Sequence, residues 1–284
     1  MNKPYFIAEV SSNHHRDLQR AKEFIKVSAD IGCNAVKFQL FKIDELFAPE
    51  ILAKSQEHIR RREWELPLEF LPELSKYTHS LGLAFSCTPF YIDAVAELES
   101  YVDFYKVASY ELLWDELIIE CAKTGKDLVL STGMATLDEI AHAVAVFKEH
   151  SSAKLTLLHT ISGYPTPVKE ANLAAIKTIK EKFKTPVGLS DHSTSIAVLC
   201  RAVHKFDASM IEFHLDLDKN GEEYSAGHCW LPHEISSAIK LINDGFLADG
   251  NGQKEPMPSE MADREWRADP SDGLRPFKHL RKNF

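Results

Sequence analysis

The sequence predicts an α/β fold, namely a (β/α)₈ barrel over residues 1–247 followed by an irregular tail over residues 248–284. Short apolar runs typical of buried parallel strands alternate eight times with segments whose apolar residues recur at helical spacing. No glycine-rich nucleotide-binding turn of the Gly-x-Gly-x-x-Gly or Gly-Lys-Ser/Thr type accompanies this alternation. Its absence favours the closed barrel over an open doubly wound sheet.

The eight expected strands span residues 5–10, 35–41, 83–86, 104–108, 128–130, 155–158, 187–189 and 210–213. The expected helices span residues 17–31, 67–81, 92–98, 115–123, 136–148, 172–183, 196–206 and 233–242. Gly32, Gly82 and Gly125 end three of the helices, and Thr136 with Glu139 forms a capping box that starts another. The polar insertion before residue 67 contains Arg60, Arg61 and Arg62, which we expect to be solvated surface.

The composition of the chain limits the kinds of binding partner and the cellular compartment that we expect. The 284 residues carry a formal charge of −9, which argues against a nucleic acid or an anionic membrane as the main partner. No apolar run approaches the roughly 20 residues that span a bilayer, and the N-terminus has no secretory signal pattern. The five cysteines are odd in number and widely spaced, as expected for free thiols in a reducing compartment. We therefore expect a cytoplasmic protein.

Polar residues follow each expected strand, and the carboxyl ends of barrel strands converge on one face. The set includes two lysines, several hydroxyls, carboxylates and histidines, at Glu9, Asn13, Lys37, Gln39, Thr88, Lys106, Ser109, Glu111, Ser131, Ser162, Tyr164, Ser190, His192 and His214. Lysines surrounded by hydroxyl donors suit a small, highly charged phosphate ester. Either lysine taken alone is equally consistent with a side chain that extends from the barrel rim into water.

His192 and His214 each end an apolar run, and a helical segment connects the two runs. If these runs are neighbouring parallel strands, both imidazoles lie at the same edge of the sheet and could hold one divalent metal ion. A single histidine at a strand end is more often a hydrogen-bonded or surface residue. The metal hypothesis therefore depends on the convergence of the two strands.

Eight motifs occur in order along residues 5–245. They are Ile-Ala-Glu-Val-x-x-Asn-His, Val-Lys-Phe-Gln, Ser-Cys-Thr-Pro-Phe, Tyr-Lys-Val-Ala-Ser-x-Glu, Leu-Ser-Thr-Gly-Met-Ala-Thr, Leu-His-Thr-x-Ser-x-Tyr-Pro-Thr-Pro, Gly-Leu-Ser-Asp-His and Ile-Glu-x-His-x-x-Leu-Asp. Together they resemble the sialic acid synthase family, the phosphoenolpyruvate-dependent N-acetylneuraminate synthases and their legionaminate and pseudaminate relatives.

The resemblance implies a barrel enzyme that condenses phosphoenolpyruvate with the open-chain aldehyde of an N-acetylated amino sugar of the mannosamine type. The products are a nonulosonic acid and phosphate. By motif match, His192 and His214 are implied as ligands of Mn²⁺ or Mg²⁺, and Glu9 and Glu111 lie near the reacting sugar and water. The implied phosphoenolpyruvate site comprises Lys37, Thr88, Lys106, Ser109, Ser131, Ser162, Tyr164 and Ser190.

The chain departs from the family pattern in four places. The common Asn-His-Asn-Gly turn is Asn13-His14-His15-Arg16, which adds basic bulk near the sugar end, and the usual Ser-Gly-Glu is Ser109-Tyr110-Glu111. Residues 225–228 read Ser-Ala-Gly-His, without the aspartate of the family's Gly-Pro-Asp-His segment.

The fourth departure is at the C-terminal end. Bacterial members of the family have a C-terminal antifreeze-like domain, and the resemblance does not extend to it. Residues 248–284 stand in its place, and we expect this tail either to form a lid with Arg267 or Arg275 near the substrate or to be solvated. Since family dimers depend largely on that domain, a homodimer through the barrel faces is left open.

Two other functions are consistent with a barrel of this kind. One is a different metal-dependent aldolase or lyase that acts on a sugar acid without phosphoenolpyruvate. The other is a catalytically silent barrel that binds a sugar. Phosphate release from phosphoenolpyruvate distinguishes both from the synthase.

Overall fold

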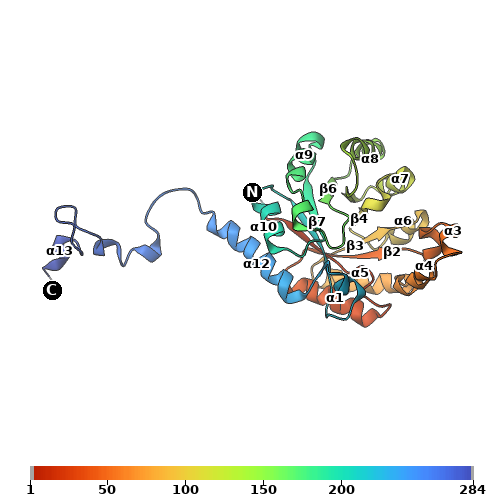
Figure 1. Cartoon of the computed structure of the whole chain (residues 1–284), viewed down its shortest axis with the longest axis horizontal. Coiled ribbons are helices and arrows are strands. Elements are labelled where there is room, and N and C mark those ends of the chain that lie inside the picture. Colours follow the sequence, from red (N-terminus) through yellow and green to blue (C-terminus); the bar gives the residue numbers. More distant parts are fainter. Residues whose placement is uncertain (1–2, 283–284) are drawn as a thin grey trace. The chain divides into compact units, whose positions relative to one another are not determined.

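The computed structural model describes residues 3–282, and its centre is a closed barrel of eight parallel strands (Figure 1). The strands are paired in sequence order, and β1 also pairs with β8 in parallel, which closes the barrel. This confirms the predicted fold. The barrel strands are β1 (Tyr5–Glu9), β2 (Ala35–Leu40), β3 (Ala84–Pro89), β4 (Phe104–Val107), β5 (Asp127–Ser131), β6 (Leu155–Thr160), β7 (Val187–Asp191) and β8 (Met210–Leu215).

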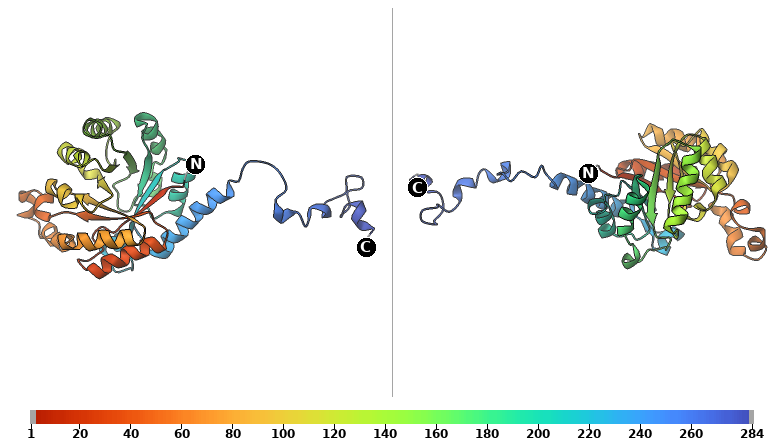
Figure 2. Two further views of the ribbon diagram at one scale, coloured as in Figure 1. Left: turned by 180° about the vertical axis from the view of Figure 1, so that it is seen from behind. Right: turned by 90° about the horizontal axis from the view of Figure 1, so that it is seen from above.

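Helices surround the strands on the outside of the barrel (Figure 2). The main ones are α1 (Leu18–Asp30), α5 (Leu71–Ser80), α6 (Ile92–Glu99), α7 (Asp115–Lys123), α8 (Leu137–His150), α9 (Ala174–Phe183), α10 (Ile196–His204) and α12 (Pro232–Ala248). Each buries an apolar stripe against the strands, as the helical spacing of its apolar residues predicts.

Local sequence signals start and end these helices. The Asp17 side chain accepts hydrogen bonds from the backbone amides of Gln19 and Arg20 and so caps α1. The capping box of Thr136 and Glu139 is present at the start of α8, as predicted. Gly32 follows α1 with φ of 90°, a conformation that favours glycine and ends the helix.

Four details differ from the sequence prediction. The polar insertion contains short helices, α2 (Ile43–Leu46), α3 (Pro49–Leu52), α4 (Gln56–Arg60) and a 3₁₀ turn at Arg61–Trp64. The helix expected from residue 67 starts with a 3₁₀ turn at Leu68–Phe70, since Pro72 favours the first turn of α5. The last helix continues beyond residue 242 to Ala248. A ninth strand, β9 (Cys229–Trp230), pairs with β8, and α11 (Glu222–Ala226) precedes it; both are too short to give a periodic pattern.

Inward-facing residues form layers along the barrel axis. The layer nearer the amino ends of the strands is apolar and includes Ile7, Ala35, Phe104, Val129, Leu158 and Met210. Because side chains alternate between the two faces of a strand, residues two positions further along lie on the same face. They are Glu9, Lys37, Lys106, Ser131, Thr160 and Glu212, all buried. His214, two positions further along β8, lies at the rim of the barrel. The barrel interior therefore consists of an apolar layer, then a charged layer, and then the open end.

The chain divides into two compact units, one ending at Gly245 and the other beginning at Phe246. The second unit contains three short helical segments, at Pro258–Glu260, Arg264–Trp266 and α13 (Lys278–Arg281). The five cysteines are free thiols, four of them buried and Cys200 partly exposed. None of the helices within residues 3–282 combines the length and apolar character needed to cross a bilayer.

Candidate active site at the open end of the barrel

A cavity of about 190 Å³ lies above the charged layer, at the carboxyl ends of the strands. Eleven of the fourteen site residues predicted from sequence line this cavity. They are Glu9, Lys37, Gln39, Thr88, Lys106, Ser109, Ser131, Tyr164, Ser190, His192 and His214. The other three, Asn13, Glu111 and Ser162, do not line it. The convergence expected from the strand ends is therefore present for most of the set.

Two buried lysines and two buried carboxylates form the floor of this cavity. Lys37 forms an ion pair with Glu9, and its Nζ also donates to Thr88 Oγ1 over 3.2 Å. Glu212 lies between the lysines, with Oε1 3.6 Å from Lys106 Nζ and Oε2 4.0 Å from Lys37 Nζ. Sequence reasoning missed Glu212, although its place two residues before His214 on the inward face is a usable signal.

Burial and mutual charge set the protonation of this floor. Burial lowers the pKa of Lys37 to about 8, although the nearby Glu212 opposes that shift. Burial also lowers the pKa of Lys106. Burial alone raises the pKa of Glu212, but Lys106 and Lys37 outweigh it and hold this pKa at about 2. Glu212 is therefore an anion at neutral pH and favours the charged form of both lysines.

Hydroxyl groups complete the cavity wall. Ser190 Oγ donates to Glu212 Oε1 over 3.1 Å, and the Gly133 amide donates to Ser109 Oγ over 3.0 Å. A Cβ at Gly133 would lie 2.3 Å from Ser162 Oγ and 2.8 Å from Ser109 Oγ. Glycine at this position therefore lets the two serine hydroxyls approach the end of β5.

The predicted residues outside the cavity lining have distinct surroundings. Glu111 Oε2 and Ser162 Oγ are buried and have no hydrogen-bond partner among residues 3–282. Burial raises the pKa of Glu111 to about 7, with Lys106 opposing the shift. Asn13 lies away from the lysines, where its Nδ2 donates to Leu215 O over 3.0 Å. Glu111 is thus poised to exchange a proton near neutral pH.

The two predicted metal ligands lie side by side, with ring centroids 5.3 Å apart. His192 Nδ1 is 2.9 Å from Ile161 O, and His214 Nδ1 is 2.9 Å from Glu223 Oε2. Burial and the nearby His214 lower the pKa of His192 to about 3, so this ring is neutral at neutral pH. With Nδ1 of each ring as the donor, each Nε2 keeps a lone pair. The pair therefore fits a divalent cation.

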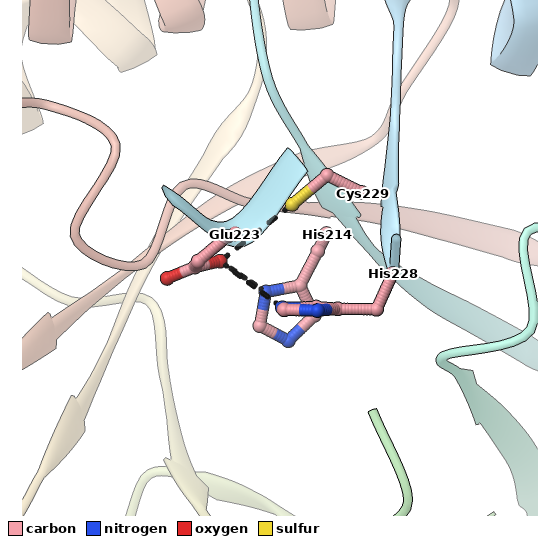
Figure 3. Close-up of side chains that lie close together, drawn as sticks. All are labelled: His214, Glu223, His228 and Cys229. Carbon is pink, nitrogen blue, oxygen red and sulfur yellow. Dashed lines mark hydrogen bonds and ion pairs between the residues drawn. The ribbon is translucent and has the colours of Figure 1, made fainter. Parts of the chain in front are cut away.

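Glu223, His228 and Cys229 surround the other side of the His214 ring (Figure 3). Glu223 comes from α11, His228 directly precedes β9 and Cys229 starts it. The pKa of Glu223 is well below its usual range: burial opposes this shift, but His214 and His228 outweigh it. The sequence analysis noted in this segment only the missing aspartate of residues 225–228 and predicted no ligand at Glu223, His228 or Cys229, because the segment has no regular period.

The basic residues that the Asn13–Arg16 turn adds are His15 and Arg16, which are exposed, whereas His14 also occurs in the common Asn-His-Asn-Gly turn. This side chain is fully buried, and burial together with His15 and Arg16 lowers its pKa to about 4, so it is neutral at neutral pH. Arg16 turns toward the insertion, where its Nη1 donates to Arg62 O over 2.9 Å. Tyr110, the second departure, lines the cavity and is 66% exposed.

Comparison with known proteins identifies the family. The NeuB family model matches residues 24–254. An uncharacterized protein from Methanocaldococcus jannaschii is 37% identical over 90% of this chain and 75% of its own length. The N,N'-diacetyllegionaminic acid synthase of Campylobacter jejuni is 35% identical over 92% of this chain and 82% of its own length.

The folds also agree. The crystal structure of N-acetylneuraminic acid synthetase from Leptospira borgpetersenii, in complex with citrate, has a TM-score of 0.81 and is 31% identical. That alignment covers 94% of this chain and 92% of the other. A family model that spans most of the chain, and relatives above 30% identity over most of both lengths, agree with the buried polar site. The chain belongs to the NeuB family of synthases.

Proposed function

We propose that this enzyme condenses phosphoenolpyruvate with the open-chain aldehyde of an N-acetylated amino sugar of the mannosamine type, giving a nonulosonic acid and phosphate. The observation that carries the proposal is the pair of buried lysines, Lys37 and Lys106, beneath a ring of hydroxyls in a NeuB-family barrel. Fixed cations beside hydroxyl donors, in a site that excludes water, suit a small substrate that carries both a phosphate and a carboxylate.

The floor of the cavity accounts for binding of phosphoenolpyruvate. Lys37 and Lys106 offset the charge of its phosphate and carboxylate groups, and Thr88, Ser131 and Ser190 supply hydroxyl donors around them. Ser109 and Ser162, the two hydroxyls against Gly133, extend this donor set at the rim. Glu212 favours the protonated form of the lysines before the substrate arrives, which preorganises the site.

The reaction requires a carbon–carbon bond and a later addition of water. The methylene carbon of phosphoenolpyruvate attacks the aldehyde carbon, the C=O π bond opens as the aldehyde oxygen takes up a proton and becomes a hydroxyl, and C2 becomes electron-deficient. Glu111 takes a proton from water as that water adds to C2, a role that its pKa of about 7 suits. The tetrahedral intermediate then expels phosphate by cleavage of the C–O bond. Glu9, which accepts a hydrogen bond from Gln39 Nε2 over 3.0 Å and pairs with Lys37, lies beside the reacting groups.

His192 and His214 would hold a divalent cation, Mn²⁺ or Mg²⁺, through their Nε2 atoms. When bound, the cation supplies Lewis-acid polarisation of the aldehyde oxygen. The protein fixes the two rings by their Nδ1 contacts to Ile161 O and Glu223. Tyr164 stacks on His192 with ring centroids 4.1 Å apart and holds that ring in place.

Residues 248–284 are a proposed lid over this site. Within that unit, the Arg267 guanidinium lies over the Phe277 ring at 5.3 Å and its Nε donates to Arg264 O. Arg275 is exposed. Of the two arginines, Arg275 is therefore the better candidate to contact a sugar.

Phosphate release tests the proposed function. The full chain is incubated with phosphoenolpyruvate, Mn²⁺ and a panel of N-acetylated aldoses, and phosphate is measured for the wild type, Lys106→Met and the surface control Lys76→Met. We expect release that requires an aldose and is lost only in Lys106→Met. Aldose-independent release, or none with any aldose, would reject the synthase, and cleavage of a sugar acid without phosphate release would establish the aldolase alternative.

A further inference from the structure

The His214 ring contacts two groups of polar residues. His192 lies beside it, with ring centroids 5.3 Å apart, and the Nδ1 atom of His214 faces Glu223, next to His228 and Cys229 (Figure 3). One ligand atom from each of His214, Glu223, His228 and Cys229 lies within 4.8 Å of all the others. Apart from the Glu223 contact that fixes the His214 ring, the second group has no role in the proposed condensation.

The spacing of these atoms matches that of ligands around one ion. Glu223 Oε2 is 2.9 Å from His214 Nδ1, 3.6 Å from His228 Nε2 and 3.6 Å from Cys229 Sγ. Ligands of a tetrahedral zinc ion, at about 2.0 Å for nitrogen and oxygen and about 2.3 Å for sulfur, are separated from one another by about 3.3 to 3.6 Å. The distances from Glu223 are therefore close to this range, and side-chain shifts that bring the other three atoms, now within 4.8 Å of one another, to this spacing would complete the site.

The charge of the cluster also favours a cation. Glu223 is a partly buried carboxylate, and the groups around its Oε2 are two imidazoles and a thiol. A divalent ion would balance the carboxylate together with a thiolate at Cys229, leaving no net charge in the buried site. Two nitrogens, one oxygen and one sulfur form a donor set suited to zinc and its chemical relatives rather than to Mg²⁺, which prefers oxygen.

The surrounding chain contacts two of the ligands, and one of these also borders a second cavity. Ser12 Oγ donates to Glu223 Oε1 over 3.0 Å, and Asn13 Nδ2 lies 3.7 Å from Cys229 Sγ. Cys229 also lines a separate cavity of about 520 Å³ together with Tyr224 and Gly227. The residue that carries the thiol thus also borders a cavity other than the lysine-lined one.

We propose that His214, Glu223, His228 and Cys229 form a second cation site, for a divalent ion of borderline softness such as Zn²⁺, separate from the His192–His214 pair. The two sites share one ring, and a neutral imidazole has one lone pair. A thiophilic ion on Nδ1 converts Nε2 of His214 into an N–H donor and removes it as a ligand for an ion beside His192. The two sites are then occupied alternately, a consequence that rests on the proposed function, whereas the site itself does not.

Cobalt spectroscopy tests the site without any assay of activity. The full chain is titrated with Co²⁺, because a thiolate ligand gives a sulfur-to-cobalt charge-transfer band in the near ultraviolet. We expect one equivalent of Co²⁺ to give this band in the wild type, in His192→Ala and in the Cys200→Ser control. Cys229→Ser abolishes the band, and Glu223→Gln weakens Co²⁺ binding at least about 100-fold, since loss of even an outer-shell partner costs 10- to 100-fold.

A melting curve for each variant identifies those that fail to fold, and Cys229→Ser and Glu223→Gln provide two independent chances to observe the effect. Co²⁺ bound by the wild type without the charge-transfer band, or Co²⁺ binding lost in His192→Ala, would overturn the site.

Mn²⁺ paramagnetic resonance tests alternate occupancy. We expect one equivalent of Zn²⁺ to release bound Mn²⁺ from the wild type but not from Cys229→Ser. Simultaneous binding of both ions would contradict alternate occupancy.

Discussion

Each buried lysine of the cavity already has a carboxylate nearby before a ligand binds. Lys37 pairs with Glu9, and Lys106 lies 3.6 Å from Glu212. The sequence indicated both lysines, because each interrupts an apolar strand, but the same reasoning overlooked Glu212. Counting in steps of two from Met210 through residue 212 to His214 places this carboxylate on the inward face, so it was predictable. The pKa shifts of these groups could not be predicted from the sequence, because they depend on burial and on neighbours from other strands.

The lowered pKa of Lys37 predicts that phosphoenolpyruvate binding weakens in alkaline solution. With a pKa of about 8 this side chain loses its charge as the pH rises through that value. We expect the affinity measured by calorimetry to fall roughly fivefold between about pH 8 and about pH 9. Lys37→Met removes the titrating group and is the control. Equal pH dependence in the wild type and the variant would assign the titration to another residue.

The raised pKa of Glu111 predicts the acid limb of the rate profile. Below about pH 7 this carboxyl is protonated and cannot accept a proton from water. We expect kcat of the wild type to fall below that pH, and Glu111→Gln to lower kcat by roughly 10²- to 10³-fold and to remove the limb. The control is Glu116→Gln, on the exposed side of α7. A limb that persists in Glu111→Gln would exclude Glu111 as the base.

The strands and helices of the barrel follow from patterns that the sequence shows directly. Buried strands such as β7 read as short apolar runs, and the Thr136–Glu139 capping box starts α8 as expected. The segment that connects β8 to β9 follows no such pattern, because its structure depends on contacts with distant residues such as Ser12 and Asn13. For the same reason its Glu223 could not be placed from sequence, although the histidine of the neighbouring β8 could.

Gly133, just after β5, leads to a prediction about the serine hydroxyls that approach it closely. A Cβ at Gly133 would lie 2.3 Å from Ser162 Oγ, so Gly133→Ala must displace the serine hydroxyls at the rim. We expect KM for phosphoenolpyruvate to rise about tenfold, as for the loss of one hydrogen bond to a charged group. Gly163→Ala is the matched control, because a Cβ there meets nothing closer than 3.8 Å. An unchanged KM in Gly133→Ala would exclude these hydroxyls from the binding site.

The molecule consists of the barrel unit and the smaller unit from Phe246 onward. The catalytic residues proposed above all belong to the barrel unit. The sequence indicated a change of character near residue 248, because apolar residues thin out there and Gly, Pro and charged residues dominate. It could not indicate what the second unit does, since short helices and exposed arginines have no characteristic period.

A lid formed by this second unit predicts a specific effect of truncation. Deleting the residues after Ala262 removes both Arg267 and Arg275, and we expect KM for the sugar to rise about tenfold or more while binding of phosphoenolpyruvate is unchanged. Arg275→Ala reproduces most of the effect, and Lys282→Ala is the surface control. Steady-state kinetics that are identical for the full and truncated chains would rule the lid out.

Condensation with cleavage of the C–O bond is tested most directly by following the bridging oxygen of phosphoenolpyruvate. This atom, replaced by a heavy isotope, is traced by mass spectrometry of the phosphate released in the presence of Mn²⁺ and an N-acetylated mannosamine-type aldose. We expect the label to leave entirely with phosphate, because water attacks C2 and the C–O bond breaks. Unlabelled phosphate with the heavy atom retained in the organic product would mean that the P–O bond breaks instead, which contradicts the proposed reaction.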